Sequence, residues 1–362
     1  MAESEDRLAA LRRQIDELDE QLVELLNRRA QVVVEVGALK RTSSISYYAP
    51  DREKAVLDRI MALNKGPLPS KVLVAIWREM MSGSLLLEKP LQVGYLGPEG
   101  SYSHLAATGK FGVSVDYVPF PDIRSIFIEV SRRHCDLGVV PVENSVGGTV
   151  IDTLDAFVEL QVKICAETIV PIHHNLLANC PMEQVKIIYS KPEVFAQCRN
   201  WLATQMREVQ TMPVASSSRA AELAAKQPEA AAIGSALAAE LYDLKIVCEN
   251  IEDNPNNCTR FFVISPESAK RTGRDKTAIM FITADKPGAL AAVLEVFRQY
   301  GLNLTSITSR PSRKQTWEYY FFVDAEGHQE DTNVSAAIRA AKEHCLQLLV
   351  LGSFPRAPEP LI

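Results

Sequence analysis

Three short segments of this chain carry polar residues of the kinds that act on small anions. Glu143, Asn144 and Ser145 follow an apolar run, and Thr259 opens another apolar run further along the chain. A third segment, GPEGSYSHLAA, begins with a glycine-rich turn and continues as a predicted helix. In α/β proteins such residues lie on loops at strand ends, where small-molecule sites are built. The three segments therefore predict an enzyme that acts on a small anionic substrate.

Each segment also has a structural explanation. The amides of Ser101, Tyr102 and Ser103 could bind an anion at a helix N-terminus, but many glycine-rich turns precede helices without doing so. Residues 143–145 could simply cap the next helix, and a threonine such as Thr259 is common in strands. The functional interpretation therefore depends on the three segments occurring together.

The residues before position 90 form the helices that must position a second set of charged side chains. Apolar residues from Leu8 to Leu39 recur at spacings of three and four, which predicts one long amphipathic helix. At about 1.5 Å per residue it is roughly 45 Å long, too long to bury its apolar stripe against two short helices over 51–63 and 70–88. We therefore expect a second copy of the chain to cover it.

Several charged side chains on these helices could face one pocket. Arg29 and Lys40 are eleven residues apart in the sequence, about 20° in helical phase, so both can point the same way. Arg12 is about 25 Å away along the axis and out of phase, so only a neighbouring copy could bring it there. A solvated helix face is the structural alternative for any one of them.

The segment LRRQIDELDEQLVELLNRRAQVVVEVGALK, followed by DRE, resembles the helical chorismate mutase domain of the bifunctional chorismate mutase/prephenate dehydratase family. In that family the domain is an intertwined helical dimer that rearranges chorismate to prephenate. The rearrangement is unimolecular, so catalysis requires a held conformer and a stabilised polar transition state. By motif position, the resemblance implies a substrate site made of Arg12 from a partner chain, Arg29, Lys40, Arg52, Glu53, Ser84 and Glu88.

The resemblance also implies a role for each charge. Arg12 and Arg29 pair with the two substrate carboxylates. Lys40 and Glu88 face the ether oxygen, where negative charge develops, and Glu53 binds the ring hydroxyl.

Two positions depart from the family's pattern. Ala49 stands where an aspartate is usual, so one polar contact is missing or is made by the backbone. Glu88 stands where many relatives have glutamine. Because an ionised carboxylate would repel a developing oxyanion, we expect Glu88 to work in its protonated form.

Residues 91–265 alternate short apolar runs with helical stretches, which predicts an α/β domain with largely parallel sheets. Its GPEG, Glu-Asn-Ser and Thr-Arg-Phe segments resemble the prephenate dehydratase domain. The resemblance implies two α/β subdomains around a cleft, like periplasmic binding proteins. It also implies loss of carbon dioxide and the ring hydroxyl from prephenate, which leaves phenylpyruvate.

The resemblance makes Thr259 essential, and we assign it to the leaving hydroxyl. Since threonine is a weak acid, Glu143 or a relayed water supplies the proton. Arg260 binds the pyruvyl carboxylate or, alternatively, lies in a structural ion pair. The carboxylate that leaves should meet neutral donors, because a cation would stabilise the ground state. Asn144, Ser145 and the amides of residues 101–103 fit that requirement.

The three histidines of this region, His104, His173 and His174, could relay a proton. Each of them follows or begins an apolar helix or strand. We therefore favour packing or a polar contact with the substrate over catalysis.

The last part of the chain predicts a regulatory domain. The order βαββαβ after a polar linker is ferredoxin-like. DKPGALAAVLEVF and NLTSITSRP resemble the ACT domain, which implies feedback inhibition by phenylalanine. Thr308 replaces the family's glutamate, and we expect this to weaken binding at the site without removing the site. By resemblance, the effector site consists of Gly288, Ala289, Leu290, Ser309 and Arg310.

Composition excludes several classes of partner. The net charge is −6 without a basic run, which argues against nucleic acid and anionic membranes. No apolar run is long enough to span a bilayer and no leader is recognisable, so we expect a cytoplasmic protein. Seven cysteines without a CxxC pair or Cys/His cluster argue against disulfides and metal. No phosphate loop or dinucleotide fingerprint is present, so we predict no cofactor.

The sequence thus predicts a multidomain homodimer or larger homo-oligomer. Two other functions remain open: an arogenate dehydratase, and a non-catalytic amino-acid sensor with a periplasmic-binding-like module. The domains expected are a helical mutase domain over 1–90, an α/β dehydratase domain over 91–265, a linker over 266–276, a ferredoxin-like ACT domain over 277–355, and a disordered tail over 356–362.

Overall fold

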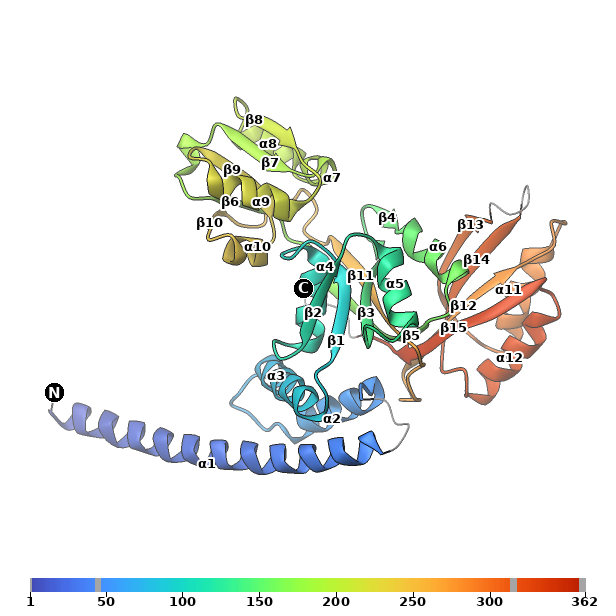
Figure 1. Ribbon diagram of the computed structural model, residues 1–362, viewed down its shortest axis with the longest axis horizontal. Helices are drawn as coiled ribbons and strands as arrows, with labels where there is room; N and C mark the ends of the chain where they lie inside the picture. Colours follow the sequence, from blue (N-terminus) through green and yellow to red (C-terminus); the bar gives the residue numbers. More distant parts are fainter. Residues whose placement is uncertain (1, 43–46, 313–317, 358–362) are drawn as a thin grey trace.

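A computed structural model describes residues 2–42, 47–312 and 318–357 of the chain. Figure 1 shows a helical N-terminal part, an α/β part in two lobes, and an α+β part at the C-terminal end. Within the described residues, no helix is long and apolar enough to cross a membrane. All seven cysteines are free thiols.

The N-terminal part contains the three predicted helices, α1 (Ala2–Arg41), α2 (Pro50–Leu63) and α3 (Ser70–Glu88). Figure 1 shows α1 extending well beyond the other two. Its C-terminal half packs on α3 at Gly37, where an added Cβ would lie 2.9 Å from the Cα of Glu88. Pro50 begins α2 and Pro69 precedes α3, as expected for a residue that fixes φ and lacks an N–H.

The first lobe of the α/β part is a six-stranded sheet with strand order β2-β1-β3-β11-β5 and β4 paired to β3. Its strands are β1 (Gln92–Leu96), β2 (Asp116–Phe120), β3 (Leu137–Asn144), β4 (Gly148–Thr149), β5 (Lys163–Pro171) and β11 (Cys258–Ser265). Its helices are α4 (Tyr102–Phe111), α5 (Ile123–Ser131) and α6 (Ile151–Glu159).

The second lobe is a five-stranded sheet with the order β10-β6-β9-β7-β8. Its strands are β6 (Asn175–Ala178), β7 (Ile187–Ser190), β8 (Gln210–Pro213), β9 (Ala230–Gly234) and β10 (Lys245–Cys248). Its helices are α7 (Pro192–Gln197), α8 (Arg199–Gln205), α9 (Ser217–Lys226) and α10 (Ala236–Leu241), with a 3₁₀ turn at Met182–Gln184. The chain passes between the lobes twice, through 172–174 and 249–257.

The prediction of largely parallel sheets was wrong, because both sheets are mixed. Strand β1 pairs in parallel with β2 and β3, and β7 with β8 and β9. Strand β11, however, returns from the second lobe and inserts antiparallel between β3 and β5. Strand β6 likewise runs antiparallel to β9 and β10. The reversed strands, β6 and β11, are therefore the ones that follow the two crossings between the lobes.

The C-terminal part has the predicted ferredoxin-like order, with an antiparallel sheet β13-β14-β12-β15. Its elements are β12 (Asp275–Ile282), α11 (Ala289–Gln299), β13 (Leu304–Pro311), β14 (Tyr319–Glu326), α12 (Thr332–Lys342) and β15 (Gln347–Pro355).

Both ends of this part differ slightly from expectation. Strand β12 begins inside the expected linker, because the Asp275 carboxylate accepts hydrogen bonds from the amides of Thr272 and Gly273. At the tail, Arg356 donates its amide to Arg274 O, and Ala357 donates its amide to Glu167. The expected disorder therefore does not extend to residues 356 and 357, and residues 358–362 lie outside the described residues.

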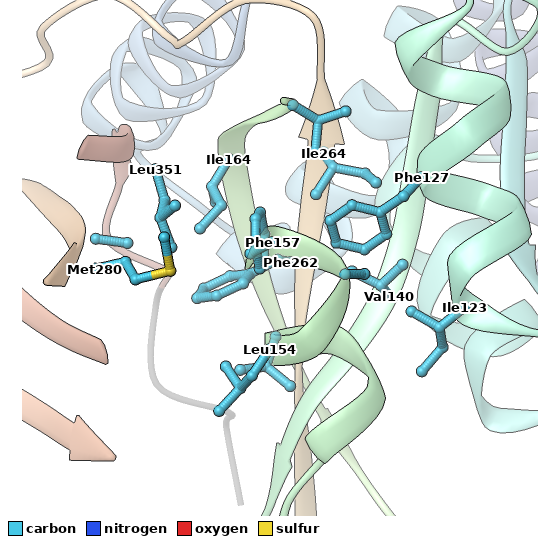
Figure 2. Packing of buried hydrophobic residues seen from close by; sticks show 14 of the residues in the cluster. Ile123, Phe127, Val140, Leu154, Phe157, Ile164, Phe262, Ile264, Met280 and Leu351 are labelled. Carbon is cyan, nitrogen blue, oxygen red and sulfur yellow. The ribbon is translucent and has the colours of Figure 1, made fainter. Parts of the chain in front are cut away.

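The first lobe and the C-terminal part share one hydrophobic core. Figure 2 shows Met280 and Leu351 of the C-terminal sheet packed beside Ile164 and Phe262 of the first lobe. The rings of Phe262 and Phe354 lie 5.5 Å apart, in an edge-to-face arrangement. A buried apolar contact of this kind fixes the C-terminal part against the back of the first sheet.

Candidate active sites

A cavity of about 610 Å³, here called the helical cavity, lies where α1, α2 and α3 meet the end of α4. Arg12 lies outside it, exposed near the start of α1. Every other residue expected at the mutase site lines the cavity, namely Arg29, Lys40, Arg52, Glu53, Ser84 and Glu88. The three helices thus bring together side chains that are up to 59 residues apart in the sequence.

Two of these cations are held by polar contacts between α1 and α3. Arg29 donates from Nη1 to the Ser84 hydroxyl at 2.6 Å, and Lys40 Nζ lies 2.6 Å from Glu88 Oε2. This contact shows Glu88 anchoring the Lys40 ammonium. The expectation that Glu88 works in its protonated form stays a prediction.

Glu53 is held by two groups at the opposite end of the cavity. Tyr48 donates its hydroxyl to Glu53 Oε2 at 2.9 Å, and Lys110 Nζ, from α4, lies 3.0 Å from each carboxylate oxygen. Burial first, and then the Glu53 carboxylate, raise the pKa of Tyr48 well above its ordinary value. Tyr48 therefore remains a hydrogen-bond donor to Glu53 over the physiological range.

Thr259 and Asn144 face each other on the paired strands β11 and β3, and we call this side the front face. The Asn144 side chain donates from Nδ2 to Thr259 Oγ1 at 2.9 Å and to Asn257 Oδ1 at 2.8 Å. Its Oδ1 accepts the amides of Val146 and Gly147. Hydrogen bonds therefore fix both the Nδ2 and the Oδ1 atom of Asn144, and one N–H of Nδ2 points at the Thr259 hydroxyl oxygen.

Hydrogen bonds continue from Asn257 into the second lobe. Asn257 Nδ2 donates to Gln197 Oε1 at 3.3 Å, and His174 Nε2 lies 2.7 Å from the same oxygen. Because an amide oxygen can only accept, His174 carries its proton on Nε2, and its Nδ1 lies 3.0 Å from the Tyr102 hydroxyl. We call these linked side chains the interlobe site: Thr259, Asn144, Asn257, Gln197, His174 and Tyr102.

The interlobe site is uncharged. Burial lowers the pKa of His174 below its ordinary value of 6.5, and the bond to Gln197 only partly offsets this. Burial also raises the pKa of Tyr102. Both groups are therefore neutral near pH 7, so this site offers hydrogen bonds without formal charge.

Of the other residues expected at this site, some have amides without an intrahelical partner and others have structural contacts. Ser101 caps α4 by accepting the His104 amide, and the amides of Tyr102 and Ser103 precede the first intrahelical bond. Ser145 exchanges hydrogen bonds with the Cys258 backbone, so its hydroxyl has a structural partner. The His104 ring stacks on Tyr95 with centroids 4.8 Å apart. For His104 the packing interpretation therefore fits.

Arg260 and Glu143 lie on the opposite, rear face of the same strand pair, because side chains alternate along a strand. Arg260 donates to Glu167 from Nη2 at 2.5 Å and to Asp324 of β14 from Nη1 at 2.6 Å. Lys276 of β12 adds a further contact to Glu167 at 3.0 Å. The second of our two alternatives for Arg260, a structural ion pair, is the one seen.

Glu143 lines a small cavity on the rear face together with Thr149, Arg260 and Thr308. This placement contradicts the expectation that Glu143 acts beside the Thr259 hydroxyl. One residue along a strand is enough to turn a side chain away from the reacting group, and the sequence motif does not reveal which residue of a pair faces the substrate.

The residues expected to bind an effector lie at two places. Gly288 precedes α11 with a φ of +81°, which favours glycine, and Ala289 and Leu290 begin the helix. Ser309 and Arg310 lie on the edge strand β13. Arg310 forms a two-pronged ion pair with Asp155 of α6, at 2.7 Å for each bond. Arg310 therefore joins the C-terminal part to the first lobe.

Four site residues were missed by sequence reasoning: Tyr48, Lys110, Gln197 and Asn257. Asn257 precedes Thr259 by two residues, and that proximity was an available signal. Lys110 and Gln197 stand in ordinary helical stretches and meet their partners only through tertiary contacts. Within the described ranges, no cluster of three or more metal-ligating side chains is present.

Three family models match consecutive parts of the chain. The model for chorismate mutase type II matches residues 11–89, that for prephenate dehydratase matches 93–269, and that for the ACT domain matches 277–343. The matched order is the order of the three structural parts.

Known proteins resemble the chain over most of its length. The bifunctional chorismate mutase/prephenate dehydratase of Aquifex aeolicus is 44% identical over 97% of this chain and 99% of its own. The structure of prephenate dehydratase from Arthrobacter aurescens in complex with L-Phe has a TM-score of 0.69 and 32% identity, covering 74% of this chain and 90% of its own. A structure described as GqqA, a quorum quenching acylase, has a TM-score of 0.68 and 26% identity, covering 74% and 98%.

Proposed function

This chain belongs to the family of bifunctional chorismate mutase/prephenate dehydratases, and from that premise we propose how its residues divide the two reactions. It is an enzyme that rearranges chorismate to prephenate and converts prephenate to phenylpyruvate. The supporting observation is that two matched residue patterns gather at two separate places, the helical cavity and the front face of β3–β11. We propose the domain bounds 1–90, 91–265 and 277–355, with a linker over 266–276 and a tail over 356–362.

In the helical cavity, we assign Arg29 to one chorismate carboxylate and Lys40 to the ether oxygen. Glu88 keeps the Lys40 ammonium in place, and Arg29 is held in the same way by Ser84. Glu53 accepts from the ring hydroxyl at the other end. Fixed charges of this kind select a compact conformer and stabilise the polarised transition state.

The second carboxylate calls for Arg12 from a partner chain, so we propose a homodimer or larger homo-oligomer. Much of the apolar stripe on α1 is about half exposed, for example Leu11 at 50%, Leu18 at 57% and Leu25 at 56%. A stripe of this size is unfavourable in water and is the kind of surface that a second helix covers.

At the interlobe site, we assign Thr259 to the departing hydroxyl. Its oxygen accepts from Asn144 Nδ2, so its own O–H proton is oriented to donate. As the bond to the carboxylate breaks and carbon dioxide leaves, its electron pair forms the new ring double bond and the bond to the hydroxyl breaks. A solvent proton relayed through water joins the departing hydroxyl, which leaves as water. The carboxylate that leaves meets neutral donors at the amides of Tyr102 and Ser103, which do not stabilise its ground state as a cation would. Asn144, whose N–H groups bond to Thr259 and Asn257, positions the threonine.

We propose that phenylalanine inhibits the enzyme through the ACT domain. The Arthrobacter aurescens relative is described in complex with L-Phe. The turn at Gly288 and the strand carrying Ser309 are the matching segments here, with Ala289 and Leu290 on the apolar side. The free thiols fit the reducing cytoplasm, where we place the protein.

The test is a pair of coupled assays on the purified full chain. We expect prephenate from chorismate, phenylpyruvate from prephenate, and inhibition of the second step by phenylalanine. Arogenate is offered in a parallel assay, and preferential conversion of arogenate would replace the prephenate assignment. A protein that binds phenylalanine but converts none of these compounds would be a sensor, and the proposal would fail.

A further inference from the structure

The helical cavity includes a cation from the neighbouring domain. Lys110 lies at the end of α4, whose first residue, Tyr102, belongs to the interlobe site. Its Nζ is 3.0 Å from both carboxylate oxygens of Glu53, and the two side chains keep only 19% and 18% of their exposure. A cation equally close to both oxygens restricts rotation of the carboxylate group.

Backbone contacts fix Lys110 relative to Glu53. Just after α4, Val113 donates its amide to Glu79 at 3.0 Å, and Ser114 donates its amide to Ser82 at 3.0 Å. Gly112, which precedes them, has a φ of +75°, and an added Cβ would lie 2.7 Å from the Ser82 Cβ. The end of α4 is therefore seated against α3 by its main chain, and the ion pair does not depend on two flexible side chains alone.

We propose that Lys110 is a positioning residue of the mutase reaction, supplied by the dehydratase domain. It holds Glu53 in the orientation that accepts the ring hydroxyl. It also offsets the negative charge that Glu53 would otherwise present to a dianionic substrate. The inference rests on the proposed mutase function of the helical cavity. It means that the dehydratase domain contributes one side chain to the mutase site.

The opposing interpretation is an ion pair that only joins two domains. An ion pair of that kind would affect both activities through domain docking. A positioning role affects the mutase alone and acts on turnover more than on substrate binding, because it orients a group that the transition state uses.

The experiment compares the full-length parent with Lys110→Met, Lys110→Arg and the control Lys54→Met. Lys54 follows Glu53 on α2 and pairs with Asp58 at 2.5 Å, outside the helical cavity. We expect Lys110→Met to lower mutase kcat roughly 10- to 100-fold with a smaller change in KM, since misplacing one catalytic contact has effects of this order. Lys110→Arg should recover most of the loss. Dehydratase kcat on added prephenate should match the parent in all three.

A double variant isolates the path through Glu53. Adding Lys110→Met to Glu53→Gln should cause little further loss of mutase kcat, because Lys110 then has no carboxylate to position. Parental mutase kinetics in Lys110→Met would overturn the inference, and so would parallel losses of both activities. A parent that lacks mutase activity would overturn the proposed function as well, which distinguishes the two failures.

Discussion

The two faces of the β3–β11 strand pair differ in charge although their residues alternate along the same backbone. The front face carries Asn144 and Thr259, joined by a neutral hydrogen bond of 2.9 Å. The rear face carries Arg260, whose guanidinium is bound to Glu167 and Asp324 at 2.5 and 2.6 Å. One step along the strand thus separates the proposed reacting group from a buried ion network.

The difference shows how one strand can serve both chemistry and domain assembly. Decarboxylation is favoured where the leaving carboxylate meets no cation, and the uncharged front face meets that requirement. The rear-face charges instead join β5 and β11 to β12 and β14 of the ACT domain. A displacement of the ACT domain would therefore move Asp324, which is bound to Arg260, the residue next to Thr259.

The largest effect should come from the front face. Thr259→Ala removes the hydroxyl that donates to the leaving group, and we expect dehydratase kcat to fall about 10²- to 10⁴-fold, the usual contribution of a positioned proton donor. Mutase kinetics should be unchanged. Thr259→Ser keeps the hydroxyl and should retain most of the rate. Steady-state assays of both reactions check this, and substantial dehydratase activity in the alanine variant would remove Thr259 from the mechanism.

The rear face should show its effect mainly in stability. Arg260→Met leaves Glu167 and Asp324 buried without their main cation. We expect a loss of about 3–5 kcal/mol in the free energy of unfolding, as is typical when one partner of a buried ion pair is removed. Burial alone would raise the pKa of Glu167, but Arg260 and Lys276 outweigh it and lower that pKa, so the carboxylate is ionised in the native protein.

Chemical denaturation of the parent and variant measures this loss. The matched control is Arg298→Met, which breaks a solvent-exposed pair with Glu295 and should leave the stability nearly unchanged. If both arginine variants were equally stable, the ion network on the rear face would contribute nothing to the association of the two domains. The two faces would then differ in their residues but not in their effect on stability.

The sequence predicted the elements well, because their signals are local. The apolar spacing between Leu8 and Leu39 predicted α1, and the helical patterns over 51–63 and 70–88 predicted α2 and α3. The βαββαβ order was sufficient for the ACT domain. The parallel sheets were predicted wrongly because the direction of β11 depends on the chain returning from the second lobe, and residue patterns do not encode that return.

The sequence identified many of the residues near the site, but it did not predict on which face of the strands each side chain lies. The motifs located Thr259 and Asn144, yet they also offered Glu143 and Arg260, which the strand turns to the rear face. The partner of Glu88, Lys40, comes from another helix. Contacts between residues far apart in the sequence decide such matters, and propensity and spacing carry no information about them.

The smallest expected effect concerns the neutrality of the front face. His174 is buried, which lowers its pKa below 6.5 in the native protein. In the unfolded chain the imidazole takes up a proton at pH values just below 6.5, whereas in the native protein it does not. The unfolded state then binds more protons, so this histidine lowers stability as the pH falls through that window.

Replacing His174 with glutamine should remove that contribution. We expect the parent to lose more unfolding free energy than His174→Gln between pH 7.5 and 5.5, by at most about 1.4 kcal/mol per pH unit. Denaturation of both proteins across this range measures the difference. Parallel losses would mean that His174 titrates alike in both states. A protonated His174 would then sit in the hydrogen-bonded chain that leads to Thr259, and the front face would not be neutral at the lower pH.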